Sequence, residues 1–166
     1  MAESGSGVTV MKSSIYTGTG IVFDSNEANI QGGAVLATTK SVFVCTSCSF
    51  TNNKAEKGGA VYVEGASRTE INLSTFDRNT ATENGAAYYI ISSKTDPMSY
   101  IKTTTFTNNQ VKNLGSIFLI EASLELDEIT LENNLTQGHT SGIVVLMSEI
   151  ILSNSKLSTQ FGQNGG

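Results

Sequence analysis

The sequence repeats itself at an interval of about 26 residues, and this repeat restricts the possible folds more than any other feature. Four segments have the form aromatic-x-x-Asn, and they begin at Phe23, Phe50, Phe76 and Phe106. Two looser copies begin at Leu131 (LENN) and Leu157 (LSTQ). The six starts are 27, 26, 30, 25 and 26 residues apart. The one long interval contains the sole proline, Pro97, in a segment (92–98) that we predict to be a loop inserted at a corner.

A second motif follows each copy of the first at nearly constant spacing. It is a small pair before an apolar run, and its copies lie at 32–35 (GGAV), 58–61 (GGAV), 84–87 (NGAA), 114–117 (LGSI), 141–144 (SGIV) and 165–166 (GG). Units of 20–50 residues that keep such a phase indicate a repeat architecture in which each unit packs on its neighbours. The chain is therefore expected to be built from stacked copies of one structural unit.

Further positions also keep the phase of the repeat. Five residues before each aromatic or leucine from Phe50 onward lie Cys45, Ile71, Ile101, Leu126 and Leu152. Two residues before it lie Ile21, Cys48, Ser74, Thr104, Ile129 and Ser155, mostly with polar residues between the two sets. This alternation predicts strands with one buried and one wet face. The runs after the glycines are more continuously apolar, so their outer face is expected either to be covered in the intact protein or to be an exposed adhesive sheet.

These patterns together predict the fold class. Helical hairpins are excluded because Gly, Thr, Ser and Asn dominate and no apolar stripe of helical period appears, and leucine-rich repeats would need more leucines per unit. Two or three short strands per unit, separated by Gly and Asn corners, predict an all-β fold. We expect a right-handed parallel β-helix (a solenoid) of about six coils of 25–30 residues, and residues 1–166 are expected to form one β-helical segment cut from a longer repeat protein.

Stacking of coils gives each repeated residue type a structural role. Residues in the same phase would lie directly above one another, about 4.8 Å apart. The phenylalanines would form a continuous stack in the core, and the asparagines would form a ladder in which side-chain amides bond their neighbours. Asparagine also tolerates the left-handed backbone that we expect at this corner. The glycines would form a second corner, where a Cβ atom would clash.

Charge and composition argue against a nucleic-acid-binding protein and against a membrane-spanning helix. The net charge is −5, and the ten Lys and Arg residues are scattered singly, whereas nucleic-acid binding needs a concentrated cationic surface. No run of 18 apolar residues occurs, so no transmembrane segment is expected, and residues 1–7 lack the features of a signal peptide. No cofactor is expected.

The pairing of F-x-x-N with G-G-A-[ILV] resembles the repeats of the chlamydial polymorphic membrane proteins, or of a similar β-helical surface repeat protein. It is carried by FDSN (23–26) with GGAV (32–35) and by FTNN (50–53) with GGAV (58–61). Those proteins are autotransporters, so the resemblance implies an adhesin with a β-helical passenger at the cell surface or outside the cell. Its partner would be a protein or glycan of a host or neighbouring cell. The resemblance assigns an adhesive role to both motifs, whose matching residues are Phe23, Asn26, Gly32, Gly33, Ala34, Val35, Phe50, Asn53, Gly58, Gly59, Ala60, Val61, Phe76, Asn79, Phe106 and Asn109.

Three functions from different classes are compatible with such a rod. The first is a non-catalytic adhesive or scaffolding segment that presents a stiff extended face. The second is the structural subunit of an extracellular fibre, a homo-oligomer formed by end-to-end stacking through unpaired strand edges. The third is a carbohydrate-active β-helix enzyme, which would need clustered carboxylates.

The acidic residues argue against the enzyme. The residues after the aromatics and leucines read Asp24, Thr51, Asp77, Thr107, Glu132 and Ser158. Asp24 and Asp77 would lie two coils apart, roughly 9–10 Å, which is at the far end of the range for an inverting carboxylate pair, with Thr51 between them. A solvated polar face is favoured, and no catalytic or metal-binding residue is predicted.

The remaining reactive residues receive structural interpretations. Cys45 and Cys48 form C-x-x-C, but only one such pair and one histidine, His139, are present, so a four-ligand zinc site would lack partners. Strand residues three apart face opposite sides unless a bend intervenes, so two buried small hydrophobic residues are favoured over a disulfide. His139 is expected in a surface loop. Of the two glycosylation sequons, Asn72 is predicted to point outward and to accept a glycan, whereas Asn134 is predicted to lie in the inward ladder.

Overall fold

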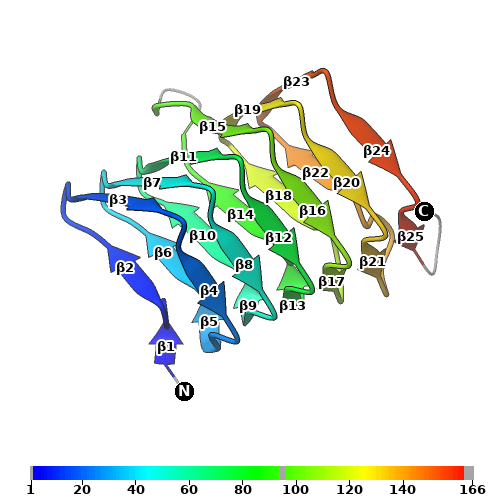
Figure 1. Cartoon of the computed structure of the whole chain (residues 1–166), viewed down its shortest axis with the longest axis horizontal. Helices are drawn as coiled ribbons and strands as arrows, with labels where there is room; N and C mark the ends of the chain where they lie inside the picture. The colour runs from blue at the N-terminus through cyan, green and yellow to red at the C-terminus, as the bar shows by residue number, and fades with distance from the viewer. Residues whose placement is uncertain (1, 94–95, 163–166) are drawn as a thin grey trace.

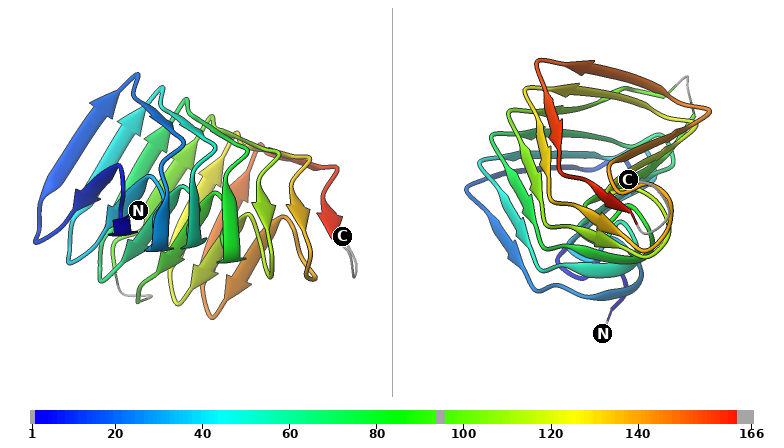
Figure 2. Two further views of the ribbon diagram at one scale, coloured as in Figure 1. Left: turned by 90° about the horizontal axis from the view of Figure 1, so that it is seen from below. Right: turned by 90° about the vertical axis from the view of Figure 1, so that its right-hand side faces the viewer.

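The structure, a computed structural model, describes residues 2–93 and 96–162, and it consists of parallel strands wound into six coils (Figure 1). Each coil contributes one strand to each of four parallel sheets, which we name A to D, and β25 adds a seventh strand to sheet A. The coils stack along one axis, and the two ends of the chain lie at opposite ends of the stack (Figures 1 and 2). The prediction of a parallel β-helix of about six coils is confirmed.

Sheets A and B carry the two segments on either side of the glycine corner. Sheet A comprises β1 (Ala2–Ser4), β5 (Ala28–Gln31), β9 (Lys54–Lys57), β13 (Thr80–Asn84), β17 (Gln110–Val111), β21 (Leu135–Thr136) and β25 (Phe161–Gly162). Sheet B comprises β2 (Val8–Val10), β6 (Val35–Ala37), β10 (Val61–Glu64), β14 (Tyr88–Ile91), β18 (Ile117–Ile120) and β22 (Ile143–Leu146).

Sheets C and D complete each coil. Sheet C comprises β3 (Ile15–Thr19), β7 (Val42–Thr46), β11 (Arg68–Asn72), β15 (Ser99–Lys102), β19 (Ser123–Asp127) and β23 (Glu149–Ser153). Sheet D comprises β4 (Val22–Asp24), β8 (Ser49–Thr51), β12 (Thr75–Asp77), β16 (Thr105–Thr107), β20 (Thr130–Glu132) and β24 (Lys156–Ser158). The prediction of two or three strands per coil is wrong, because one left-handed residue bends the chain between sheets C and D in every coil. These residues are Gly20, Ser47, Leu73, Thr103, Glu128 and Asn154.

The core is organised as columns of like side chains. Successive rings of Phe23, Phe50, Phe76 and Phe106 stack nearly parallel, with centroid separations of 4.9, 4.4 and 4.7 Å. Strand register continues the column through Leu131 and Leu157. The second predicted column, from Cys45 through Ile71, Ile101 and Leu126 to Leu152, is also in register. The sequence period therefore identified the core correctly.

The asparagine ladder is present and is more completely bonded than the sequence indicated. The side chain of Asn53 donates to Asn79 Oδ1 and to the carbonyl of Phe23, both at 2.9 Å. Its Oδ1 accepts the backbone N–H and the amide N–H of Asn26. Asn79, Asn109 and Asn134 repeat the donation to the phenylalanine carbonyl of the preceding coil. In the sixth coil Gln160 makes the corresponding bond to the carbonyl of Leu131.

The sequence predicted that the ladder asparagine itself takes the left-handed conformation at this corner. That prediction is wrong, because the residue before each ladder position takes it. These residues are Ser25, Asn52, Arg78, Asn108, Asn133 and Thr159, with φ between 53° and 56°. The asparagines serve through their amide groups, which replace backbone partners at a buried turn. The residue before the ladder asparagine can therefore vary in type. Arg78 occupies that position, while the backbone N–H and the side-chain amide of Asn79 both donate to Asn109 Oδ1.

The glycine corner agrees with its prediction. Gly32 and Gly58 have φ of 60° and 62°, a conformation that costs glycine little. A Cβ atom on Gly33 would lie 2.1 Å from the carbonyl oxygen of Gly59, so the next coil approaches too closely for any side chain. The copy at 165–166 lies outside the described residues. The segment 92–98, of which residues 94–95 are not described, lies at the corner between β14 and β15 as predicted.

Of its two predicted states, the apolar outer face of sheet B shows the covered one in its aromatic row, and residues of the same chain provide the cover. Leu36, Tyr62, Tyr89 and Phe118 form a second row outside the main core, with ring centroids 4.9 and 5.2 Å apart along Tyr62, Tyr89 and Phe118. All four are nevertheless buried. Ile91, Leu114, Ile120 and Val144 pack against this row, so the chain itself covers the aromatic faces.

The interpretation of Cys45 and Cys48 as unlinked buried residues is wrong, because they form a disulfide bond. Cys45 lies in β7 and Cys48 follows the bend at Ser47, where φ is 55°. The bend turns both side chains inward, so both cysteines are buried. A disulfide was predicted to require a bend between the two cysteines, but no residue between them indicated such a bend.

The columns predict how substitutions affect stability. Phe50→Ala should lower the free energy of unfolding by about 3–5 kcal/mol through lost burial and a residual cavity. Asn53→Ala should lower it by about 1–3 kcal/mol, because it leaves buried backbone groups without partners. Chemical denaturation measures both changes. The exposed Asn29→Ala should be nearly neutral, and an unchanged melting temperature for Phe50→Ala would contradict the stacked core.

Candidate functional site

The outer surface of sheets C and D, which we call the C/D face, carries rows of mostly polar side chains. Two rows of sheet C are formed by Thr17, Val44, Glu70, Tyr100, Glu125 and Ile151 and by Thr19, Thr46, Asn72, Lys102, Asp127 and Ser153. Two rows of sheet D are formed by Val22, Ser49, Thr75, Thr105, Thr130 and Lys156 and by Asp24, Thr51, Asp77, Thr107, Glu132 and Ser158. The face therefore extends over all six coils, with one row position per coil.

Hydrogen bonds between coils hold the acidic groups of this face. Asp24 accepts hydrogen bonds from Thr51 Oγ1 (2.6 Å) and Asn52 Nδ2 (3.0 Å) in the next coil. Thr107 and Asn108 bond Asp77 in the same way, at 3.1 and 2.8 Å. Ser153 and Asn154 bond Asp127 at 2.7 and 2.9 Å. A hydroxyl and an amide thus secure a carboxylate at three places along the face.

At Asp24 and Asp127 these bonds favour the charged form of the carboxylate. The hydroxyl of Thr51, with help from Asn52 and Ser25, lowers the pKa of Asp24 below its usual value. Ser153 and then Asn154 lower the pKa of Asp127. As predicted, Asp24 and Asp77 lie two coils apart with Thr51 between them. The structure therefore does not bring the two carboxyl groups together as a pair.

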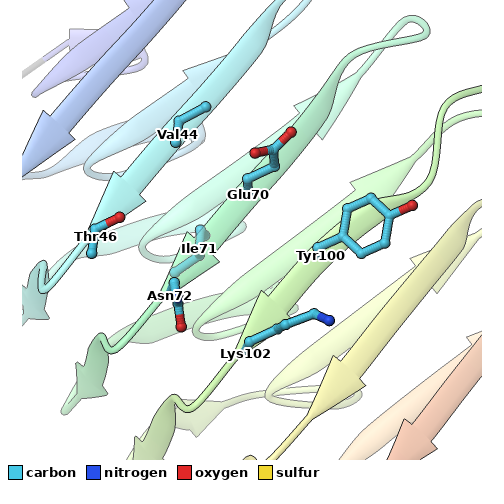
Figure 3. Close-up of a pocket in the computed structure, with 7 residues that line it drawn as sticks. All are labelled: Val44, Thr46, Glu70, Ile71, Asn72, Tyr100 and Lys102. Atoms are coloured by element: carbon cyan, nitrogen blue, oxygen red, sulfur yellow. The ribbon is translucent and has the colours of Figure 1, made fainter.

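A hollow of about 380 Å³ lies in the sheet C part of the face (Figure 3). Its lining residues come from β7, β11 and β15, and they are Val44, Thr46, Glu70, Ile71, Asn72, Tyr100 and Lys102. The ammonium group of Lys102 lies 6.0 Å from the centroid of the Tyr100 ring and 3.0 Å from Glu125 Oε1. Hydrogen bonding to Glu125 raises the pKa of Lys102. Arg68 pairs with Glu70 beside the hollow.

The residues predicted from the family motifs lie elsewhere. The aromatic rings Phe23, Phe50, Phe76 and Phe106, the ladder asparagines Asn53, Asn79 and Asn109, and both GGAV segments (32–35 and 58–61) are buried, and only Asn26 is half-buried. They shape the coil and cannot contact a partner from inside it. The residues available for contact alternate with them, and that alternation was the one sequence signal for the C/D face.

The two sequons have opposite environments. Asn72 is exposed on β11 at the edge of the hollow, as predicted. Asn134 is buried, and its side chain serves the ladder, in agreement with its predicted place. Glycosylation of Asn72 stays a prediction. His139 is exposed between β21 and β22.

Within residues 2–93 and 96–162, no group of three or more His, Cys, Asp or Glu side chains is placed to hold a metal ion. Over the same residues, no helix has the length and apolar character needed to cross a membrane.

The comparisons with known proteins agree with this architecture. The family model for a right handed beta helix region matches residues 2–157, so the chain belongs to this family. Neither the curated proteins nor the solved structures contain a significant match. The family defines the coil and its handedness, and the chlamydial likeness is not confirmed by it.

The secured carboxylates predict a dependence of stability on acid. Because the folded-state pKa values of Asp24 and Asp127 are lowered, their contribution is present above the pKa of an unfolded aspartate, about 3.9, and is lost as the pH falls through the folded values. Replacement of both by asparagine should reduce the difference between the unfolding free energies at neutral pH and in acid. Urea titrations at the two pH values measure it. The exposed Glu149→Gln serves as the control, and an unchanged pH difference in the double variant would contradict the assignment.

Proposed function

We propose that the chain is a non-catalytic adhesion or scaffolding segment that binds partners at a cell surface or outside the cell through the C/D face. The observation that supports it best is the continuity of this face, whose rows run in register over all six coils. Parallel strand pairing between coils fixes the backbone of the face, so little conformational entropy would be lost on binding. The disulfide between Cys45 and Cys48 is typical of an oxidising compartment.

The chemistry of the acidic rows favours binding over catalysis. A general acid needs a carboxyl group whose pKa is raised towards neutrality. The pKa of Asp24 is instead lowered, by hydroxyl and amide donors of the neighbouring coil. Asp24 and Asp77 are separated by a threonine whose hydroxyl is already bonded to one of them. Such carboxylates suit a fixed, charged surface better than proton transfer.

Coated beads test the proposal. Beads that carry the chain should bind cultured epithelial cells above the level of bare beads. The variant Thr75→Arg/Thr105→Arg places bulk and charge in the middle of the C/D face and should lower binding about tenfold, the effect expected of a disrupted contact centre. The matched variant Thr82→Arg/Gln110→Arg alters exposed positions of sheet A and should bind like the parent. No binding by the parent, or equal loss in both variants at unchanged melting temperature, would overturn the proposal.

A second candidate, end-to-end association into a fibre, is favoured by the surface of the sixth coil. Leu152 and Leu157 are 44% and 46% exposed, although the other members of their columns in coils two to five are buried. Within the described chain, β22, β23, β24 and β25 pair with a neighbour on one side only. Exposed apolar columns flanked by unpaired strand edges are complementary to a further coil, and in the proposed fibre a second copy of the chain takes that place.

Sedimentation velocity tests this candidate. The parent chain should form larger species as its concentration rises. Leu152→Lys/Leu157→Lys should keep it monomeric, because charged groups would enter the apolar contact between coils. Ile30→Lys, at an exposed position of sheet A, is the matched control and should associate like the parent. A parent that stays monomeric at all concentrations would rule the fibre out.

A further inference from the structure

We infer that the hollow on sheet C is a binding site for a neutral sugar residue of a glycan. This inference rests on the proposed function, because it names the chemical class of partner at the C/D face. Tyr100 on β15 bounds one side of the site, with Glu70 and Val44 in the same row and Thr46, Asn72 and Lys102 in the adjacent row (Figure 3).

The aromatic group supplies the apolar part of the site. Tyr100 is half-buried in an outward position of β15, so the C/D face presents its side chain at the hollow (Figure 3). Sugar rings have an apolar face made of C–H groups, and these pack on aromatic rings. Tyrosine also brings a large contact area at a low cost in side-chain entropy. Val44 adds a second apolar group at the opposite side of the hollow.

The polar groups provide the directional part. Asn72 and Thr46 offer both donors and acceptors, Glu70 offers acceptors, and Lys102 offers donors. Lys102 and Glu70 are each held by a second charged residue, Glu125 and Arg68 respectively. Hydroxyl groups of a sugar act as donor and acceptor at once, so they can bond groups of every one of these kinds. A hollow that combines an aromatic platform with a few convergent polar groups is typical of small-ligand sites.

The charges favour a neutral sugar over an acidic one. The ionic groups in and beside the hollow are Arg68, Glu70, Lys102, Glu125 and Asp127, so that three negative charges face two positive ones. Both cations are already engaged by carboxylates. A uronate or sulfated sugar would meet a net negative charge and would have to displace one of these pairs. The whole chain, with a net charge of −5, repels polyanions as well.

Amide NMR titrations test the inference. The probes are cellohexaose, mannohexaose and N-acetylchitohexaose, with polygalacturonate as the acidic comparison. At least one neutral oligosaccharide should bind with Kd in about the millimolar range and shift the amide signals of β7, β11 and β15. Tyr100→Ala should weaken that binding about tenfold, because the anchoring ring is lost. Tyr100→Phe, which keeps the ring, should stay close to the parent.

Ile151→Ala is the matched control, since Ile151 occupies the same outward row as Tyr100 two coils away. It should leave binding unchanged. Absence of binding by every neutral oligosaccharide, signal shifts outside sheet C, or equal affinity of Tyr100→Ala and the parent would overturn the inference. Tighter binding of polygalacturonate would overturn its charge argument.

The bead assay separates this outcome from that of the proposed function. If Tyr100→Ala beads bind cells like the parent, whereas Thr75→Arg/Thr105→Arg beads do not, adhesion stands and the sugar site is not the contact that supports it. If parent beads bind no cells although an oligosaccharide binds the hollow, the adhesive proposal fails and the sugar site stands. Melting temperatures of all variants show that each one is folded.

Discussion

The whole structure depends on the in-register stacking of one coil on the next. Register brings the Phe50 ring to within 4.4 Å of Phe76 and places the amide of Asn53 between Phe23 and Asn79. It also decides which carboxylates meet hydroxyls on the outside, as at Asp24 and Thr51. A shift of one residue would move every core side chain to the solvent face. Core, ladder and surface are therefore consequences of a single geometric relation between coils.

The features that recur at the same position in every coil were predictable from the sequence. Those that depend on local bends of the backbone were not. Phe23, Phe50, Phe76 and Phe106 were found because a period of about 26 residues is visible in the letters. The left-handed residues between sheets C and D were not found, because Ser47, Leu73 and Glu128 share no side-chain property. That one omission explains both the wrong strand number and the wrong interpretation of the cysteines, since the bend at Ser47 brings Cys45 and Cys48 together.

The sequence predicted which residues face outward, but it did not predict where on that outer surface the hollow lies. Alternation identified outward positions such as Thr51 and Thr107, but the hollow arises from which side chains happen to be neighbours across three coils. Val44, Glu70 and Tyr100 are 26 and 30 residues apart and differ in type, so no motif connects them. The family motifs drew attention to conspicuous residues, and those residues are conspicuous because the interior repeats similar side chains from coil to coil.

This division between interior and surface bears on how such a rod acquires a function. The interior columns tolerate little change, because each ring and amide contacts its copies above and below. The backbone beneath the outward rows is already fixed by strand pairing between coils. A substitution in an outward row therefore alters a contact surface without altering the coil. Specificity in this architecture must therefore reside in positions that break the repeat. Tyr100 is such a position, since its row holds threonine, valine, glutamate and isoleucine in the other coils.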